Sequence, residues 1–196
     1  VQDENIYGKS LFLHYADLSD DASLRRIFSK VNPDEVYHLA GQSHVALSFE
    51  IPELTTHEIA NATLKLLEIC RDQVKPPKIY LAGSSEIFGH AKESIQTEGT
   101  QFNPSSPYGV CKAFCVQMGK VYRSGYGMHV SNGILYNHES PRRGENFVTQ
   151  KIVRGAASIA QGRAETLELG NTEIERDWGY APDYVLGMWM MLQEEQ

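Results

Sequence analysis

The 196-residue sequence has few cysteines, no long apolar run and no excess of positive charge, and each shortage excludes a class of protein. Its three cysteines, Cys70, Cys111 and Cys115, form neither an even set for disulfides nor a zinc-ligand spacing. We therefore expect no metal site, and we read Cys111 and Cys115 as small buried hydrophobes. Reduced thiols favour a cytoplasmic protein. Because no apolar stretch approaches the ~20 residues that cross a bilayer, we expect no membrane span.

Basic residues are outnumbered, with 18 Lys and Arg against 25 Asp and Glu, so the formal net charge is −7. A nucleic-acid-binding protein would normally carry a basic stripe, and we expect no nucleic-acid partner. Hydrophobic residues make up 41% and charged residues 22%, which is typical of a globular protein with its own core.

A glycine-rich turn after the first strand is also missing, although doubly wound nucleotide-binding sheets normally open with one. The chain begins Val1-Gln2-Asp3-Glu4, with neither an initiator methionine nor a signal sequence. We interpret the chain as an internal piece of a longer protein, entered at its third strand.

Short apolar segments alternate with helical patterns of more than ten residues, which predicts a parallel sheet covered by helices. Strands are expected at 11–15, 35–40, 78–82 and 129–135, with a short one at 166–169. Helices are expected at 20–31, 55–71, 108–126, 146–161 and 184–193. The predicted class is α/β, a doubly wound, Rossmann-like sheet lacking its N-terminal strands. Residues 1–135 would be a partial dinucleotide-binding domain, and residues 136–196 the start of a smaller substrate-binding lobe.

One Tyr-x-x-x-Lys pair, Tyr108 and Lys112, lies at the start of a predicted helix, where positions i and i+4 share a face. The lysine charge can lower the pKa of the phenol and allow it to accept a proton. Ser84 and Glu86 follow a predicted strand and add a hydroxyl and a carboxylate. Asp17 and Gly41 also follow strands, and ligands of open parallel sheets bind at such ends. Together these residues predict a site that removes protons from a sugar-like alcohol.

The sequence resembles the extended short-chain dehydrogenase/reductase family and, within it, the GDP-mannose 4,6-dehydratases. The similarity runs over nearly the whole chain, and its most specific part is the stretch 137–145. The matching segments are Tyr15-Ala16-Asp17-Leu18-Ser19-Asp20, Pro33-Asp34-Glu35-Val36-Tyr37, Ser43-His44-Val45-Ala46, Ser85-Glu86, Ser106-Pro107-Tyr108 with Lys112, Asn132-Gly133-Ile134-Leu135, Asn137-His138-Glu139-Ser140-Pro141-Arg142-Arg143-Gly144-Glu145 and Arg176-Asp177-Trp178-Gly179.

The resemblance implies a lyase that turns GDP-mannose into GDP-4-keto-6-deoxymannose with NADP, and a homo-oligomer in the full-length protein. Tyr108 and Lys112 would take the C4 hydroxyl proton, Ser84 would bind the C4 oxygen, and Glu86 would remove the C5 proton and protonate the leaving C6 hydroxyl. The cofactor would be bound by Asp17, Leu18, Leu39, Ala40, Gly41, Ser43, Tyr108, Lys112, His138 and Arg143. The nucleotide sugar would be bound by Asn137, Phe147, Val148, Lys151 and Arg176.

Other interpretations remain open. Leu54 stands where the family usually has a tyrosine near the cofactor, and Gly83-Ser84 replaces the commoner Ser-Thr. Arg142 and Arg143 would instead pair at the surface with nearby glutamates if they bound no phosphate. The rival functions are another nucleotide-sugar epimerase or reductase of the same fold, and a non-catalytic fragment.

Overall fold

The computed structural model describes residue 6 and residues 8–195. Two compact units make up the chain: the first ends at Gly133, and the second spans Ile134–Glu195. The first contains α1(Asp21–Val31), β1(Glu35–His38), α2(Leu47–Glu50), α3(Pro52–Thr56), the π-helical turn η1(His57–Asn61), α4(Ala62–Arg71), β2(Lys78–Ala82), the 3-10 turn η2(Ser85–Ile87), α5(Pro107–Tyr126) and β3(Val130–Gly133). The second contains β4(Asn137–Glu139), α6(Val148–Ala160), β5(Trp178–Tyr180) and α7(Ala181–Gln193).

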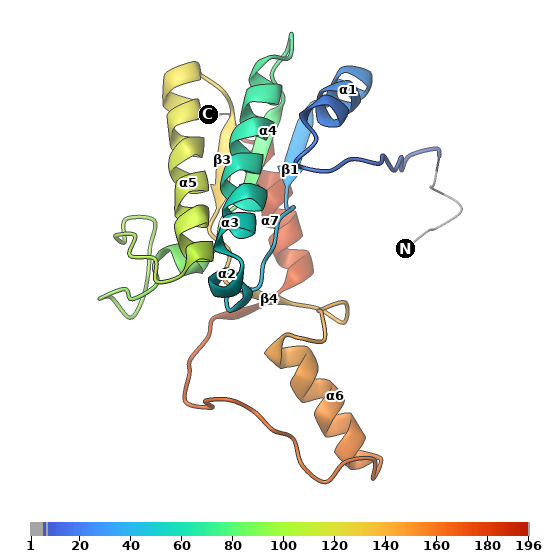
Figure 1. The fold of residues 1–196 in the computed structure, drawn as a ribbon, viewed down its shortest axis with the longest axis vertical. Helices are drawn as coiled ribbons and strands as arrows, with labels where there is room; N and C mark the ends of the chain where they lie inside the picture. The colour runs from blue at the N-terminus through green and yellow to red at the C-terminus, as the bar shows by residue number, and fades with distance from the viewer. Residues whose placement is uncertain (1–5, 7, 196) are drawn as a thin grey trace. The chain divides into compact units, whose positions relative to one another are not determined.

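The first unit is built on a parallel sheet of order β1-β2-β3. Each step from one strand to the next passes through a helix, so α4 and α5 lie side by side along the sheet (Figure 1). In register, His38 pairs with Leu81 and Ala82 with Gly133. All three strands therefore end at one edge. The predicted α/β class with a parallel sheet is confirmed.

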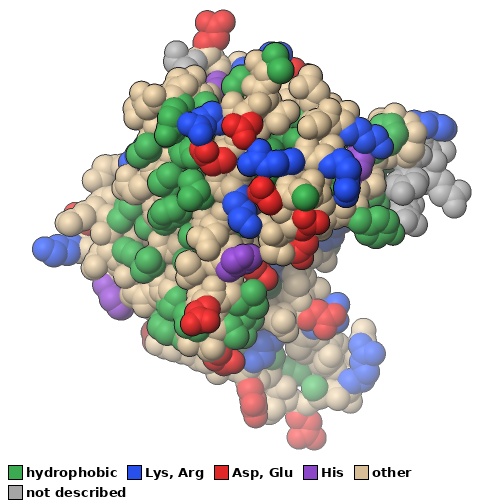
Figure 2. All heavy atoms as spheres, turned by 45° about the horizontal axis from the view of Figure 1, so that its top comes forward, with side chains coloured by type: hydrophobic (Ala, Val, Ile, Leu, Met, Phe, Trp, Pro, Cys, Tyr) green, Lys and Arg blue, Asp and Glu red, His purple; other side chains and the backbone are tan. Residues whose placement is uncertain are grey.

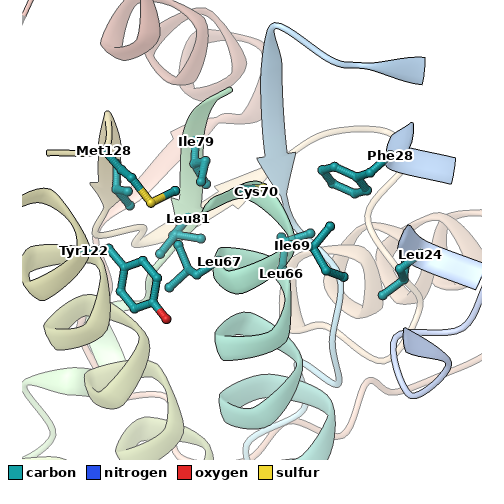
Figure 3. Packing of buried hydrophobic residues seen from close by; sticks show 11 residues of the cluster. Leu24, Phe28, Leu66, Leu67, Ile69, Cys70, Ile79, Leu81, Tyr122 and Met128 are labelled. Carbon is teal, nitrogen blue, oxygen red and sulfur yellow. The ribbon is translucent and has the colours of Figure 1, made fainter. Parts of the chain in front are cut away.

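The core of the first unit lies between the sheet and the helices α1, α4 and α5 (Figure 3). Leu67, Ile69 and Ile79 are fully buried in it, and Tyr122 of α5 closes one end. Removing such side chains from water contributes roughly 1.5–3 kcal/mol each, which fixes α5 and its N-terminal residues on the sheet.

Helix ends follow the capping residues of the sequence. The Asp20 carboxylate accepts a hydrogen bond from the Ser23 N–H at 3.2 Å and starts α1, as predicted. Helix α5 ends at Gly127, whose φ of +64° is the left-handed conformation that glycine adopts without strain.

Two predicted strands are wrong. Residues 12–16 form no strand, and the side chains of Phe12 and Leu13 are 63% and 61% exposed. A strand needs a continuous hydrogen-bonding neighbour, and here only Leu11 forms an isolated bridge, while the described sheet of the first unit consists of β1, β2 and β3. Residues 166–169 are also irregular. The parallel pair β4–β5 was not predicted, because three-residue strands leave too few positions for a periodic pattern.

Charges of both signs interleave on the face of the molecule shown in Figure 2. Among the ion pairs of the first unit, Arg25 pairs with Asp21 at 3.0 Å and with Asp72 at 2.7 Å. Within the described residues, no helix combines the length and apolar character required to cross a bilayer.

Candidate active site

Tyr108 occupies the first turn of α5 at the edge where the strands of the first unit end. The Ser106 hydroxyl caps the helix by accepting from the Gly109 N–H at 3.0 Å, and Pro107 supplies the preset φ of a first helical residue. The Tyr108 N–H donates to the buried Ser48 hydroxyl at 3.2 Å. Only 8% of Tyr108 is exposed. Its side chain is therefore positioned by the cap, by Ser48 and by packing.

Ser84 and Glu86 approach this helix from the end of β2. The Ser84 hydroxyl caps the turn η2 by accepting from the Glu86 N–H at 3.3 Å. Gly109 permits the close approach, because a Cβ there would lie 2.6 Å from the Glu86 carbonyl oxygen. Ser84 and Glu86 both act on the Tyr108 phenol: Ser84 favours its ionised form, and the Glu86 charge disfavours it. Three of the four predicted catalytic residues thus interact.

Burial raises the pKa of Tyr108 above its usual value, the hydrogen bond from Ser84 opposes this, and the negative charge of Glu86 adds to it. The net direction is opposite to the lowering expected from Lys112. A buried phenolate loses hydration, and the Glu86 carboxylate repels it. Tyr108 therefore stays protonated at neutral pH unless further positive charge enters the site.

Lys112, one turn further along α5, is the fourth predicted catalytic residue. Its ammonium group donates to the Ala82 carbonyl at 2.8 Å and lies 5.7 Å from the centre of the Tyr108 ring. Burial lowers the pKa of Lys112, since the charged form loses water. The lysine thus joins the end of β2 to the helix that carries Tyr108.

A polar network near Lys112 was not predicted. His38 at the end of β1 is 8% exposed, and its Nε2 lies 3.1 Å from the Thr63 hydroxyl oxygen. The Cys115 thiol donates to the same oxygen at 3.2 Å. Burial, aided by the Lys112 charge, lowers the pKa of His38 to about 4. Two features of the sequence could have indicated this network: His38 ends an apolar strand, and Thr63 lies on the apolar side of a helix.

A pocket of about 650 Å³ lies beside the strand ends, within the first unit. Three predicted cofactor residues, Asp17, Leu18 and Gly41, line it. Gly41 has φ +130°, and a Cβ there would sit 3.3 Å from Ile59. Only glycine suits this conformation without strain. The other residues that line the pocket are Ser19, Gln42, Leu54, His57 and Glu58.

The remaining cofactor candidates of the first unit, Leu39, Ala40 and Ser43, are exposed and follow β1. Asp17 accepts hydrogen bonds from the hydroxyl and the N–H of Ser19, at 2.5 and 2.7 Å. These bonds hold the pKa of Asp17 below its usual value, so it stays ionised at the pocket wall.

The second unit holds the other candidates. The His138 ring stacks on Tyr184, with centres 5.2 Å apart, and its Nδ1 lies 2.8 Å from the Tyr136 carbonyl oxygen. Arg143 pairs with Glu139 at 3.2 Å, as the surface-pairing alternative expected, whereas Glu145 pairs with Arg154.

The substrate candidates are distributed along the second unit. Asn137 begins β4, Phe147 caps α6, and Val148 and Lys151 lie in the first turns of that helix. Arg176 is exposed just before β5 and donates to the Glu175 carbonyl at 2.8 Å. Among the residues described, no three His, Cys, Asp or Glu side chains gather closely enough to hold a metal ion.

Comparison with known proteins identifies the family. The GDP-mannose 4,6 dehydratase family profile matches residues 1–196. GDP-mannose 4,6-dehydratase of Vibrio cholerae is 52% identical over 100% of this chain and 53% of its own length. GDP-mannose 4,6 dehydratase 1 of Arabidopsis thaliana is 50% identical over 100% of this chain and 55% of its own length. The chain thus spans about half the length of these curated relatives.

Solved structures show the same fold. RMD from Pseudomonas aeruginosa, complexed with NADPH, superposes with a TM-score of 0.86 and 27% identity over 92% of this chain and 62% of that one. UDP-glucose 4-epimerase of Thermus thermophilus, in complex with NAD, gives a TM-score of 0.82 and 26% identity over 100% of this chain and 64% of that one. The Rossmann-like class predicted from the sequence is confirmed.

Proposed function

The chain belongs to the GDP-mannose 4,6 dehydratase family, and from this premise we propose that the complete protein is a hydro-lyase that converts GDP-mannose to GDP-4-keto-6-deoxymannose. The relatives from Vibrio cholerae and Arabidopsis thaliana carry the name of this activity. The proposal assigns the chemistry to the edge of the first unit where Tyr108, Ser84 and Glu86 meet.

One observation carries the proposal: Ser84 and Glu86, at the end of β2, lie against the first turn of α5, where both act on the Tyr108 phenol. A dehydratase needs two different proton acceptors, one for an alcohol and one for a carbon acid. A phenol and a carboxylate at one site supply both functions. An epimerase or reductase needs no carboxylate at this position, so Glu86 favours the dehydratase.

In the proposed mechanism, Tyr108 takes the proton of the C4 hydroxyl while Ser84 hydrogen-bonds the C4 oxygen. A bound nicotinamide cofactor would supply the redox chemistry, accepting hydride from C4 and giving it back at C6. The C4 ketone acidifies C5, where Glu86 removes the proton, and Glu86 then protonates the C6 hydroxyl, which departs as water. C5 regains one proton when C6 is reduced, which balances the proton that Tyr108 took from the C4 hydroxyl. Lys112 and the positive ring of a bound cofactor would act against the effect of burial on the pKa of Tyr108.

The pocket lined by Asp17, Leu18 and Gly41 supports a dinucleotide cofactor, because it adjoins the strand ends where such ligands bind. Gly41 lets a ligand approach the backbone closely, since it carries no side chain. We assign NADP as the cofactor, and the NADPH complex of the structurally similar RMD supports this choice. Leu39, Ala40, Ser43, His138 and Arg143 would complete its site.

We assign cofactor binding to residues 1–135 and the start of the substrate lobe to residues 136–196. Anionic substrates favour cationic side chains, and Lys151 and Arg176 are both exposed. Asn137, Phe147 and Val148 complete the proposed substrate residues.

We further propose that the complete protein is a homo-oligomer in the cytoplasm. Exposed apolar residues along α5 support self-association: Val110 and Val121 are 55% and 50% exposed, and Phe114 is 37% exposed. All three cysteines are free thiols, which suits a reducing compartment.

An end-point assay tests the activity. The protein expressed from its complete gene is incubated with NADP+ and, separately, with GDP-mannose, UDP-glucose and dTDP-glucose. We expect a 4-keto-6-deoxy product from GDP-mannose with no net consumption of cofactor. Interconversion of sugars that keep their C6 hydroxyl would show an epimerase instead, and failure to bind NADP+ would favour the non-catalytic alternative.

A further inference from the structure

Arg143 in the second unit is held in place by its neighbours. Its guanidinium carbon lies 3.6 Å from the centre of the Phe147 ring, which supports one face of the group. Its Nε lies 3.2 Å from the Glu139 carboxylate, close enough for an ion pair although the geometry is not that of a hydrogen bond. The side chains of Arg143 and Glu139 are only 21% and 17% exposed.

Glu139 is itself held at two points, its backbone and its carboxylate. The backbone of Glu139 ends β4, in register with Tyr180 of β5. Its Oε2 accepts a hydrogen bond from the hydroxyl of Thr149, in the first turn of α6. Glu139 therefore joins the short sheet to the beginning of α6, and Arg143, in the loop between β4 and α6, contacts Glu139.

The two terminal amino groups of Arg143 make no hydrogen bond to any residue that the structure describes. Two parallel N–H donors on a planar cation match two oxygens of a phosphate group. An arginine stacked on one face and paired at Nε presents only this edge to a ligand.

We propose that Glu139, Thr149 and Phe147 are positioning residues that fix the Arg143 guanidinium so that its terminal edge binds a diphosphate group. This inference rests on the proposed function, which supplies two diphosphates, one in the cofactor and one in the nucleotide sugar. The negative charge of Glu139 reduces the net positive charge of the site. The same carboxylate fixes the direction in which the terminal N–H groups of Arg143 point.

These two effects have opposite signs, which makes the proposal testable. If charge neutralisation dominated, Glu139→Gln would tighten anion binding. If positioning dominates, the same change weakens binding, because Arg143 must then be ordered by the ligand. Immobilising one rotamer-rich side chain corresponds to about a two- to tenfold change in affinity.

The experiment measures dissociation constants by calorimetry in the complete gene product for three probes: NADP+, GDP and inorganic pyrophosphate. Glu139→Gln and Phe147→Leu are made alone and in an Arg143→Ala background. We expect Glu139→Gln to weaken binding of one nucleotide, and of pyrophosphate, about two- to tenfold when Arg143 is present and to have no effect in its absence. Phe147→Leu should show the same dependence on Arg143 with pyrophosphate, which has no base or sugar for Phe147 to contact. The nucleotide affected identifies the source of the diphosphate. Glu145→Gln, which breaks the exposed pair with Arg154, is the matched control and should change nothing.

Three results would each overturn the positioning role: a change in affinity that is equal with and without Arg143, no change in affinity, or tighter binding of the probes by Glu139→Gln. Circular dichroism identifies variants that fail to fold, and Thr149→Val then provides a milder disturbance of Glu139. If the effect of Glu139→Gln on pyrophosphate binding depends on Arg143 but the protein does not dehydrate GDP-mannose, the proposed function is refuted and the positioning role stands. Dehydration without coupling would refute this inference alone.

Discussion

Replacing Lys112 by methionine should remove activity at little cost in stability. The wild-type ammonium gains a charged hydrogen bond to the Ala82 carbonyl at 2.8 Å, which contributes about 1.5–3 kcal/mol. Burial of the charge opposes this gain, as the lowered pKa of Lys112 indicates. Because desolvation of a buried ion costs several kcal/mol, Lys112→Met should change the free energy of unfolding by no more than about 1–2 kcal/mol at pH 7.

The pH dependence has a definite sign. The pKa of Lys112 is lower in the folded state than in the unfolded chain, so the unfolded chain binds more protons between the two values. Wild-type stability therefore gains a contribution as the pH rises from the folded pKa toward the usual lysine pKa of 10.5. Lys112→Met lacks this contribution, and its stability relative to wild type should fall over that range.

Urea unfolding followed by circular dichroism measures the stability, and product formation from GDP-mannose measures the activity. We expect a rate loss of about 10²- to 10⁴-fold, as for removal of a general acid–base element. Lys120→Met, on the same helix and 5.5 Å from the Phe102 ring, is the control and should retain activity. The reasoning is refuted if Lys112→Met turns over at the wild-type rate, or if it loses stability heavily and both lysine variants lose activity alike.

Two further predictions concern the supports of the site. Ser106→Ala removes the cap of α5 and should lower the unfolding free energy by about 1 kcal/mol. It should also slow turnover, because Tyr108 lies two residues away. Asp20→Ala, which uncaps α1, should lose similar stability in urea melts but keep its turnover, and equal rates in both variants would contradict the role of the cap. His38 is buried, and its pKa is lowered from 6.5 to about 4. Between these two pH values the unfolded chain binds the proton and the folded protein does not, so wild-type stability should fall by up to about 3 kcal/mol as the pH drops from 6.5 to 4. Urea melts of His38→Gln at pH 4 and 7 should lack this loss of stability, and a variant with the wild-type pH dependence would show that His38 does not cause it.

Local sequence signals predicted the helices and central strands well. Asp20 sets a helix end through its side-chain cap, and Pro107 and Gly127 do so through their backbone preferences. The segment around Phe12 misled the prediction because an apolar run specifies a strand only where a neighbouring strand supplies hydrogen bonds.

The candidate site was partly predictable for the same reason. Ser84, Glu86 and Tyr108 follow strand or helix boundaries, which can be read from the sequence and which meet at one sheet edge. Contacts between distant segments could not be read in this way. The pairing of His38 with Thr63, 25 residues apart, depends on how α4 packs on β1, and the raised pKa of Tyr108 depends on its burial.

The most direct test of the account is a single-turnover experiment on Glu86→Gln, in the complete gene product with NADP+ and GDP-mannose. Oxidation at C4 needs Tyr108 and Ser84 but not Glu86, whereas loss of water requires the carboxylate. We predict that the absorbance of reduced cofactor appears and persists, with no 4-keto-6-deoxy product. Wild-type product formation by this variant, or tight substrate binding without any cofactor reduction, would contradict the assignment of Glu86 as the C5 base.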